Sequence, residues 1–193
     1  HLPSLDITFF EKSWRPGGRI STRKHGEYAF DHGAHYLKTD HGMIGLNEFL
    51  EKIDAIKILK GPFCRNISQN SPIEEKEIIV GKEGNESIPL KFHKYLHYPT
   101  IFSTKITSIE NTNQEYYLKA GEEKFGPFDY VFCAIPFEQS KNLLSKFVDY
   151  SDIPNIEFDA IWTIMLAFNK RLGAPFQFGY HLTPEISFLM NQN

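Results

Sequence analysis

The sequence predicts an α/β fold, and three of its features support this prediction. Residues 5–11 alternate loosely and then become fully apolar, which is typical of a parallel strand covered on both faces. The apolar run 129–134 leads into a predicted helix over 137–144, as expected of a strand that returns to a parallel sheet. Between these parts, three β-rich runs separated by short turns predict a β-meander: 100–110, 116–120 and 122–125.

The middle of the chain is predicted to alternate between helices and strands. An apolar stripe at helical spacing predicts an amphipathic helix of about three turns that starts near Met43. Short strands are predicted at 56–59 and 78–80. Ser87 can cap the next helix, which carries Pro89 in its first turn.

The last part of the chain predicts the beginning of a second sheet. A predicted linker over 150–154 separates it from the elements before it. The β-rich runs that follow are 160–168, 176–182 and 186–190. These runs are expected to form a mixed sheet that this chain begins and does not close.

Composition favours a folded protein with a small polar ligand. The chain has 193 residues, of which 41% are hydrophobic and 15% aromatic, and this is enough to build the core of about one domain. The 21 basic and 24 acidic residues give a net charge of -3 and are mixed along the chain, so they predict neither a nucleic-acid footprint nor a membrane patch. Cys64 and Cys133 are the only cysteines, which favours a reducing compartment, and we expect a cytoplasmic protein.

An acidic residue ends the first predicted strand. In a nucleotide-binding βαβ unit, an acidic side chain at the end of the second strand accepts hydrogen bonds from a ribose, about 20 residues after a G-x-G-x-x-G loop. Glu11, followed by Lys12, fits this acid. Counting back about 20 residues from Glu11 passes the first residue of the sequence, so we expect the first strand and its phosphate loop to lie outside this chain.

A glycine pair follows this acid after a short interval. Gly17 and Gly18 lack a Cβ, so their backbone can approach an anion, and Arg19 can donate two parallel hydrogen bonds to a phosphate. Taken alone, the motif is explained more simply by an ordinary turn followed by a surface arginine. Its combination with Glu11 and with the later Gly33-Ala34 favours a dinucleotide.

The segment Gly33-Ala34-His35-Tyr36 places two small residues beside two rings. This pattern is expected where a backbone passes close to a flat ligand, although a strand end with a glycine bulge explains it as well. A nearby cluster of histidines raises the hypothesis of a zinc site, but the spacings match no usual ligand pattern and no cysteine pair supports it, so we predict no metal. These histidines are His25, His32, His35 and His41. No nucleophile elbow, P-loop or zincin motif occurs, and no catalytic residue is assigned.

Three motifs taken together resemble the renalase-like group of FAD-dependent oxidoreductases, within the flavin-containing amine oxidase superfamily. They are Phe10-Glu11-Lys12-Ser13, Pro16-Gly17-Gly18-Arg19 and the segment from Phe30 to Tyr36. The resemblance implies a Rossmann-like FAD-binding domain with a β-meander, interleaved with a mixed-sheet substrate domain. We expect residues 1–55 and 97–150 to form part of the first domain, and residues 56–96 and 151–193 to form part of the second.

The resemblance also implies roles for individual residues. Glu11 would bind the adenosine ribose, Arg19 the pyrophosphate region, and the backbone near Ile106 the adenine. His35 and Tyr36 would lie near the isoalloxazine, at a position where the family often carries Gln in place of His35. The complete set expected to contact FAD is Glu11, Lys12, Gly17, Gly18, Arg19, Gly33, Ala34, His35, Tyr36 and Ile106.

The activity that the resemblance implies is hydride transfer from an amine or dihydronicotinamide-type substrate to flavin, and then to oxygen. Because the family's glycine loop and last segment are not in this sequence, we expect a fragment that is inactive alone, and whether the fragment itself binds FAD stays open. Two alternatives stay open as well, namely a non-catalytic α/β interaction module without the cofactor loop and a nicotinamide-binding domain that uses Glu11. The expected partner is a small-molecule substrate, and exposed sheet edges favour self-association.

Overall fold

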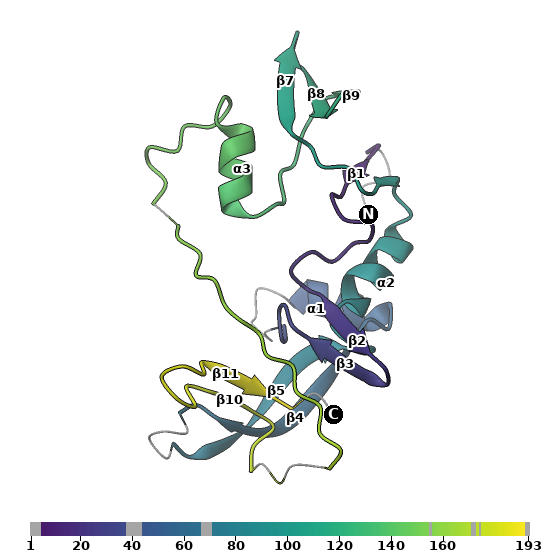
Figure 1. Cartoon of the computed structure of the whole chain (residues 1–193). Helices are drawn as coiled ribbons and strands as arrows, with labels where there is room; N and C mark the ends of the chain where they lie inside the picture. The colour runs from purple at the N-terminus through teal and green to yellow at the C-terminus, as the bar shows by residue number, and fades with distance from the viewer. Residues whose placement is uncertain are drawn as a thin grey trace. The chain divides into compact units, whose positions relative to one another are not determined.

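The computed structural model describes residues 5–37, 44–66, 71–154, 156–170, 173 and 175–191, and it confirms the predicted α/β class. Along the described chain, three helices separate runs of two to four strands (Figure 1). The chain divides into two compact units, which are described separately. Unit 1 comprises His1–Arg15 and Tyr98–Trp162, and unit 2 comprises Pro16–His97 and Thr163–Asn193.

Unit 1 combines a short parallel strand pair with the predicted meander. The run 100–110 predicted as the meander's first strand is wrong as one strand, because only 100–101 and 108–110 are in strands and the former pairs outside the meander. Strand β1 (Phe9–Phe10) pairs in parallel with β6 (Thr100–Ile101). The ring of Phe10 lies 5.0 Å from that of Phe125 and 6.0 Å from that of Phe128, so aromatic contacts pack β1 against the meander. The remaining elements of this unit are β7 (Ser108–Thr112), β8 (Glu115–Ala120), β9 (Glu123–Phe128) and α3 (Phe137–Leu144).

Unit 2 is built on a mixed sheet of four strands in the order β11-β10-β4-β5. Strands β10 and β4 are parallel, whereas the other neighbours are antiparallel. A separate hairpin of β2 (Thr22–His25) and β3 (Tyr28–Asp31) precedes the sheet in the sequence. The other elements are α1 (Ile44–Lys52), β4 (Ile56–Cys64), β5 (Ile73–Gly81), α2 (Ser87–Leu96), β10 (Phe178–Tyr180) and β11 (Phe188–Met190).

Strand β5 separates two hydrophobic clusters, because successive side chains of a strand point to opposite faces. On one face Ile79 packs with residues of α1 and α2, among them Leu50 and Ile88. On the other face Ile78 and Val80 pack with β4 and β10 side chains. The helices therefore cover one face of β5.

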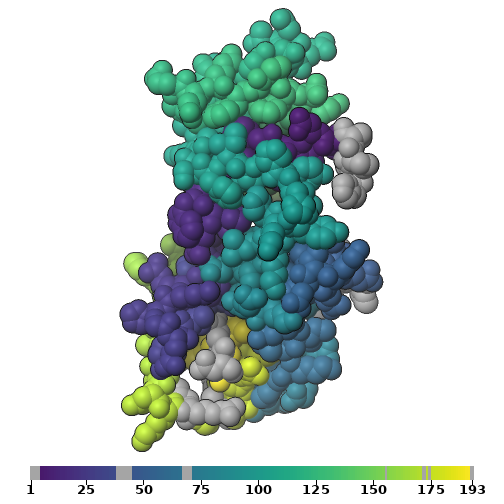
Figure 2. Space-filling model, turned by 90° about the vertical axis from the view of Figure 1, so that its right-hand side faces the viewer, coloured from purple at the N-terminus to yellow at the C-terminus, as the bar shows by residue number. Residues whose placement is uncertain are grey.

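Helix α2 also lies next to the β2–β3 hairpin. In Figure 2 the teal residues of α2 lie beside the indigo residues of the hairpin, and a hydrogen bond joins the start of α2 to β2.

Several predicted elements are confirmed and one pair is longer than predicted. Helix α3 has the predicted bounds, and β10 and β11 lie within the predicted runs. Strands β4 and β5 contain nine residues each, and their pairing runs from Ile56 opposite Gly81 to Cys64 opposite Ile73. The polar residues 74–77 carry no apolar alternation, so the backbone ladder that extends β5 through them leaves no hydrophobic signal in the sequence.

The predicted strands over 129–134 and 160–168 are wrong, because both runs lack secondary structure. Phe132 is 91% exposed and Trp162 is 93% exposed, so the expected burial is absent as well. Cys133 is only partly buried. A strand requires a neighbouring backbone to complete its ladder, and within the described part of the chain neither run has one. The first strand is parallel as predicted, but it is shorter than predicted and Phe9 is 41% exposed.

Helix α2 begins at Ser87 rather than after it. The residue at its N-cap is Glu86, which makes no side-chain capping hydrogen bond. The Ser87 hydroxyl instead accepts a hydrogen bond from the Glu83 N–H at 3.5 Å. The predicted domain boundaries stay a prediction, although residues 16–55 lie in the same compact unit as residues 56–97. No helix in the described ranges is long and apolar enough to cross a membrane.

We expect two of the three isoleucines of β5, Ile78 and Ile73, to differ sharply in their contribution to stability. Ile78 is 1% exposed and Ile73 is 50% exposed. Ile78→Ala removes buried methyl groups and leaves a cavity, so it should lower the free energy of unfolding by about 2–5 kcal/mol. Ile73→Ala should lower it by less than about 1 kcal/mol. Urea unfolding of both variants tests this placement, and equal losses would contradict it.

Candidate functional site

Glu11 lies at the carboxyl end of the parallel strand β1. Its N–H donates to the Ile101 carbonyl at 3.0 Å, which continues the pairing of β1 with β6 by one residue. One oxygen of the half-buried Glu11 carboxylate accepts a hydrogen bond from the Ser13 N–H at 2.7 Å. This bond orients the carboxylate at the strand end, where open α/β sheets bind their ligands. Lys12 is exposed, and Ile106 is half-buried in the stretch between β6 and β7.

Gly17 and Gly18 form a turn in unit 2. The Ile20 N–H donates to the Gly17 carbonyl at 2.9 Å and closes the turn. The φ angles of Gly17 and Gly18 are 134° and 53°, a conformation in which other residues are strained. Gly18 and Arg19 are exposed, and a Cβ on Gly18 would meet no atom within 4 Å. The turn therefore presents an open backbone next to a cation.

The structure brings Arg19 together with Gly33 and Ala34. The Ala34 N–H donates to the Arg19 carbonyl at 2.9 Å, and the His32 N–H donates to the Ser21 carbonyl at 3.3 Å, so the two segments extend the β2–β3 hairpin. A Cβ on Gly33 would lie 2.0 Å from the Arg19 carbonyl oxygen. From the sequence we expected this glycine to clear space for a flat ligand, whereas the atoms it approaches are the backbone of Arg19.

A buried polar network connects this segment to the turn before α2. Asn85, which is 1% exposed, donates from Nδ2 to the carbonyls of Ala34 and His35, each at 2.8 Å. Its Oδ1 accepts from the Gly81 N–H at 2.7 Å. Its own N–H donates to the Asp31 carboxylate at 2.8 Å, and Thr22 donates to the same carboxylate oxygen. Sequence reasoning missed Asn85, and the only local signal was an asparagine in a glycine-containing turn just before a helix.

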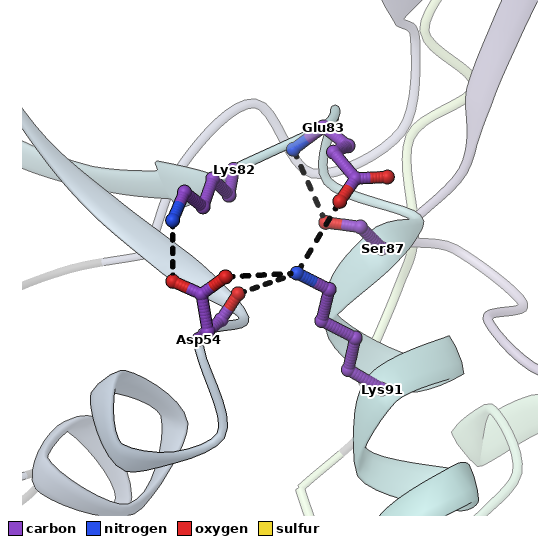
Figure 3. A network of polar contacts seen from close by, with 5 residues as sticks. All are labelled: Asp54, Lys82, Glu83, Ser87 and Lys91. Carbon is purple, nitrogen blue, oxygen red and sulfur yellow. Dashed lines mark hydrogen bonds and ion pairs between the residues drawn. The ribbon is translucent and has the colours of Figure 1, made fainter.

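Ion pairs hold the same turn from its exposed side (Figure 3). Lys82 forms an ion pair with Asp54, and Lys91 on α2 lies 3.6 Å from the other Asp54 oxygen. Lys91 also lies 3.3 Å from Glu83 and donates to the Asp54 carbonyl at 2.6 Å. The hydrogen bond from Lys82 is the main reason why the pKa of Asp54 is lowered. The network links the end of α1 to the turn and to α2, but exposed pairs of this kind contribute little stability each.

The rings of His35 and Tyr36 pack against the mixed sheet. His35 stacks on Phe188 of β11 with ring centroids 4.5 Å apart. Burial lowers the pKa of His35, while its hydrogen bond with the Asp31 carbonyl and the charge of Asp31 oppose this shift. The hydroxyls of Tyr36 and Tyr180 hydrogen-bond to each other, and burial followed by this bond raises the pKa of Tyr180. Both rings are thus held by β10 and β11.

The structure therefore assembles the predicted residues in two groups. Unit 1 holds Glu11, Lys12 and Ile106, and unit 2 holds the glycine turn with Arg19 and the segment from Gly33 to Tyr36. Over the described ranges, no group of three or more histidine, cysteine or acidic side chains is placed to hold a metal ion. His41, one of the histidines considered for zinc, lies outside the described residues.

Residues 2–52 match the family model described as an NAD(P)-binding Rossmann-like domain. The match covers β1 with Glu11, the glycine turn, the β2–β3 hairpin, the segment from Gly33 to Tyr36 and helix α1. The match supports a Rossmann-like, dinucleotide-binding segment of the oxidoreductase type in this part of the chain. It contains every predicted site residue except Ile106.

Two glycine-to-alanine substitutions should change stability in opposite directions. Gly33→Ala places a methyl group against the Arg19 carbonyl, and the resulting overpacking should lower the free energy of unfolding by about 1–3 kcal/mol. Gly45 lies in α1 with no atom near its virtual Cβ, so Gly45→Ala should raise the free energy of unfolding by up to about 1 kcal/mol. Urea unfolding measures both effects. A neutral Gly33→Ala would show that the two backbones are not in contact.

Acid should destabilise the chain partly through His35. Because its folded pKa is lowered, the unfolded chain binds more protons once the pH falls below the unfolded value of about 6.5. The contribution of His35 is therefore complete above about pH 6.5 and is lost progressively below it. His35→Gln should show a smaller loss of unfolding free energy than the wild type between about pH 7.5 and about pH 5.5. An unchanged pH dependence would mean that His35 titrates normally in the folded chain.

Proposed function

We propose that this chain is part of an FAD-dependent oxidoreductase similar to the renalase-like group. Its substrate would be an amine or a dihydronicotinamide-type molecule that gives up a hydride. FAD, when bound, supplies the hydride-accepting ring and the route to oxygen. The residues of this chain would bind the cofactor and orient it.

The observation that carries the proposal is the position of Glu11. A carboxylate at the carboxyl end of a parallel strand, within a segment that matches a Rossmann-like family, is the arrangement that binds the ribose of a dinucleotide. The Ser13 N–H holds one carboxylate oxygen, and this restricts the side chain before any ligand arrives. Ribose hydroxyls can then donate to a carboxylate that is already oriented.

The other residues present the donors that FAD requires. The open backbone at Gly18 and the exposed Arg19 suit a pyrophosphate, which needs backbone access and a cation. His35 and Tyr36 supply rings of the kind that line a flat heterocycle. The exposed Ala34 beside them has the smallest side chain with a Cβ, so it would allow close approach.

A nicotinamide cofactor is the second candidate, because the matched family is described as NAD(P)-binding. In that case Glu11 would accept hydrogen bonds from the ribose next to adenine in NAD. The Gly17-Gly18-Arg19 element makes this candidate the less favoured of the two. The two candidates share the ribose interaction of Glu11. They differ in which dinucleotide, FAD or NAD(P), the chain binds.

Flavin fluorescence quenching in a titration of FAD into the chain tests the proposal. We expect saturable binding that weakens by about 10- to 100-fold in Glu11→Gln and in Arg19→Ala, since each change removes hydrogen bonds to a charged group. Arg23→Ala and Glu27→Gln are matched controls, because both residues are exposed on or next to the β2–β3 hairpin. Their affinities should stay within about twofold of the wild type.

Competition separates the two cofactors. Excess NAD or NADP should leave the FAD titration unchanged if the site is built for FAD. Tight NAD binding that FAD does not displace would overturn the FAD assignment and favour the nicotinamide alternative. Binding of neither dinucleotide would overturn the proposed function of this chain.

A further inference from the structure

The side chain of Asn85 is fully committed to backbone groups. Nδ2 donates to the carbonyls of Ala34 and His35, and Oδ1 accepts from the Gly81 N–H. The two carbonyls lie 51 and 50 residues away in the sequence, so the amide joins distant stretches of the chain. Only a side chain with two donors and one acceptor in this arrangement satisfies all three groups.

The segment that Asn85 holds lies outside the regular strands, and its other contacts are the Ala34 N–H bond to the Arg19 carbonyl and the packing of the two rings on β10 and β11. Residues 32–36 belong to no strand, and the sheet contact resumes only at Leu37, which forms an isolated bridge with Ile79. The carbonyls of Ala34 and His35 therefore receive their hydrogen bonds from a side chain and not from a ladder. The conformation of this peptide depends on Asn85.

We infer that Asn85 is a positioning residue that, through the carbonyls of Ala34 and His35, fixes the backbone presenting His35 and Tyr36 to the bound dinucleotide. This inference rests on the proposed function. Asn85 itself is buried and would not touch the ligand. Asn85 would act on the site through the peptide group that joins Ala34 to His35, because a rotation of this group would move Ala34 and the His35 ring together.

Asn85→Asp provides a test with an internal rescue. The carboxylate keeps an acceptor for the Gly81 N–H. In place of the Nδ2 group, which donates to the two carbonyls, it has an oxygen that only accepts hydrogen bonds. At about pH 8 the Kd for FAD should rise at least about tenfold relative to the wild type. Burial, the neighbouring Asp31 and the two carbonyls favour the protonated carboxyl, which regains one donor, so the ratio to wild type should fall to about two- to threefold at about pH 5.5. The titratable side chains in contact with position 85 or next to it are Asp31, His35 and Glu86, and the exposed ion pairs of the same turn add Asp54, Lys82, Glu83 and Lys91. The wild type measured at each pH corrects for their titration.

Two further variants separate positioning from general stability. Asn85→Ala lacks donor and acceptor, so its Kd should rise about tenfold at both pH values without rescue. Thr22→Val breaks the buried hydrogen bonds to Asp31 and to the Glu86 N–H but leaves the Asn85 amide intact. It should lower stability in urea unfolding while its Kd for FAD stays within about twofold of the wild type. Asn142→Asp, on exposed α3, controls for an added charge.

The outcomes for this inference and for the proposed function differ. A wild type that binds FAD, together with Asn85→Asp and Asn85→Ala variants that bind it equally well, would overturn the positioning role alone. The positioning role also fails if Thr22→Val weakens FAD binding as much as Asn85→Ala, because the effect would then track stability. A wild type that binds no dinucleotide would overturn the proposed function and this role with it.

Discussion

The buried amide of Asn85 is the constraint on which the rest of unit 2 depends. A buried polar group that lacks its partners costs more than a hydrogen bond normally contributes, so all three backbone groups around this amide must stay in place together. Asp31 and Thr22 extend the requirement to the β2–β3 hairpin, and Glu86 extends it to the start of α2. The hairpin, the segment after it and the helix therefore cannot shift independently. The exposed ion pairs of Asp54 stabilise the same turn much less strongly.

Local patterns predicted the elements that local interactions build. Helices α1 and α3, the meander and strands β10 and β11 carry apolar periodicity and turn residues within a few positions of each other. Asn85 could not be found in this way, because its partners lie about 50 residues away and an asparagine before a helix ordinarily indicates a cap. The close approach of Gly33 was expected, but the partner was not, because sequence alone does not reveal which backbone passes by. The motifs predicted a dinucleotide-binding segment, which the family match supports, whereas the contacts that hold this segment could not be predicted.

The apolar runs 129–134 and 160–168 show why hydrophobicity alone does not define a strand. Apolar composition reports that a side chain gains free energy by leaving water, whereas a strand needs a second backbone that satisfies its N–H and C=O groups. The two properties usually coincide in parallel sheets. Here Phe132 and Trp162 stay exposed and their backbones lie in no ladder within the described ranges. Strand β5 is the opposite case, since polar residues 74–77 join a ladder without any hydrophobic pattern.

The electrostatics of His35 bear on how the chain departs from the resemblance. A histidine where the renalase-like group often carries glutamine introduces a side chain that becomes positively charged as the pH falls. Burial lowers the pKa of His35 and so disfavours the charged imidazolium. A neutral imidazole has one donor and one acceptor, like a shortened amide, and its ring already stacks on an aromatic partner. A neutral histidine therefore differs from glutamine in hydrogen-bond geometry and not in charge.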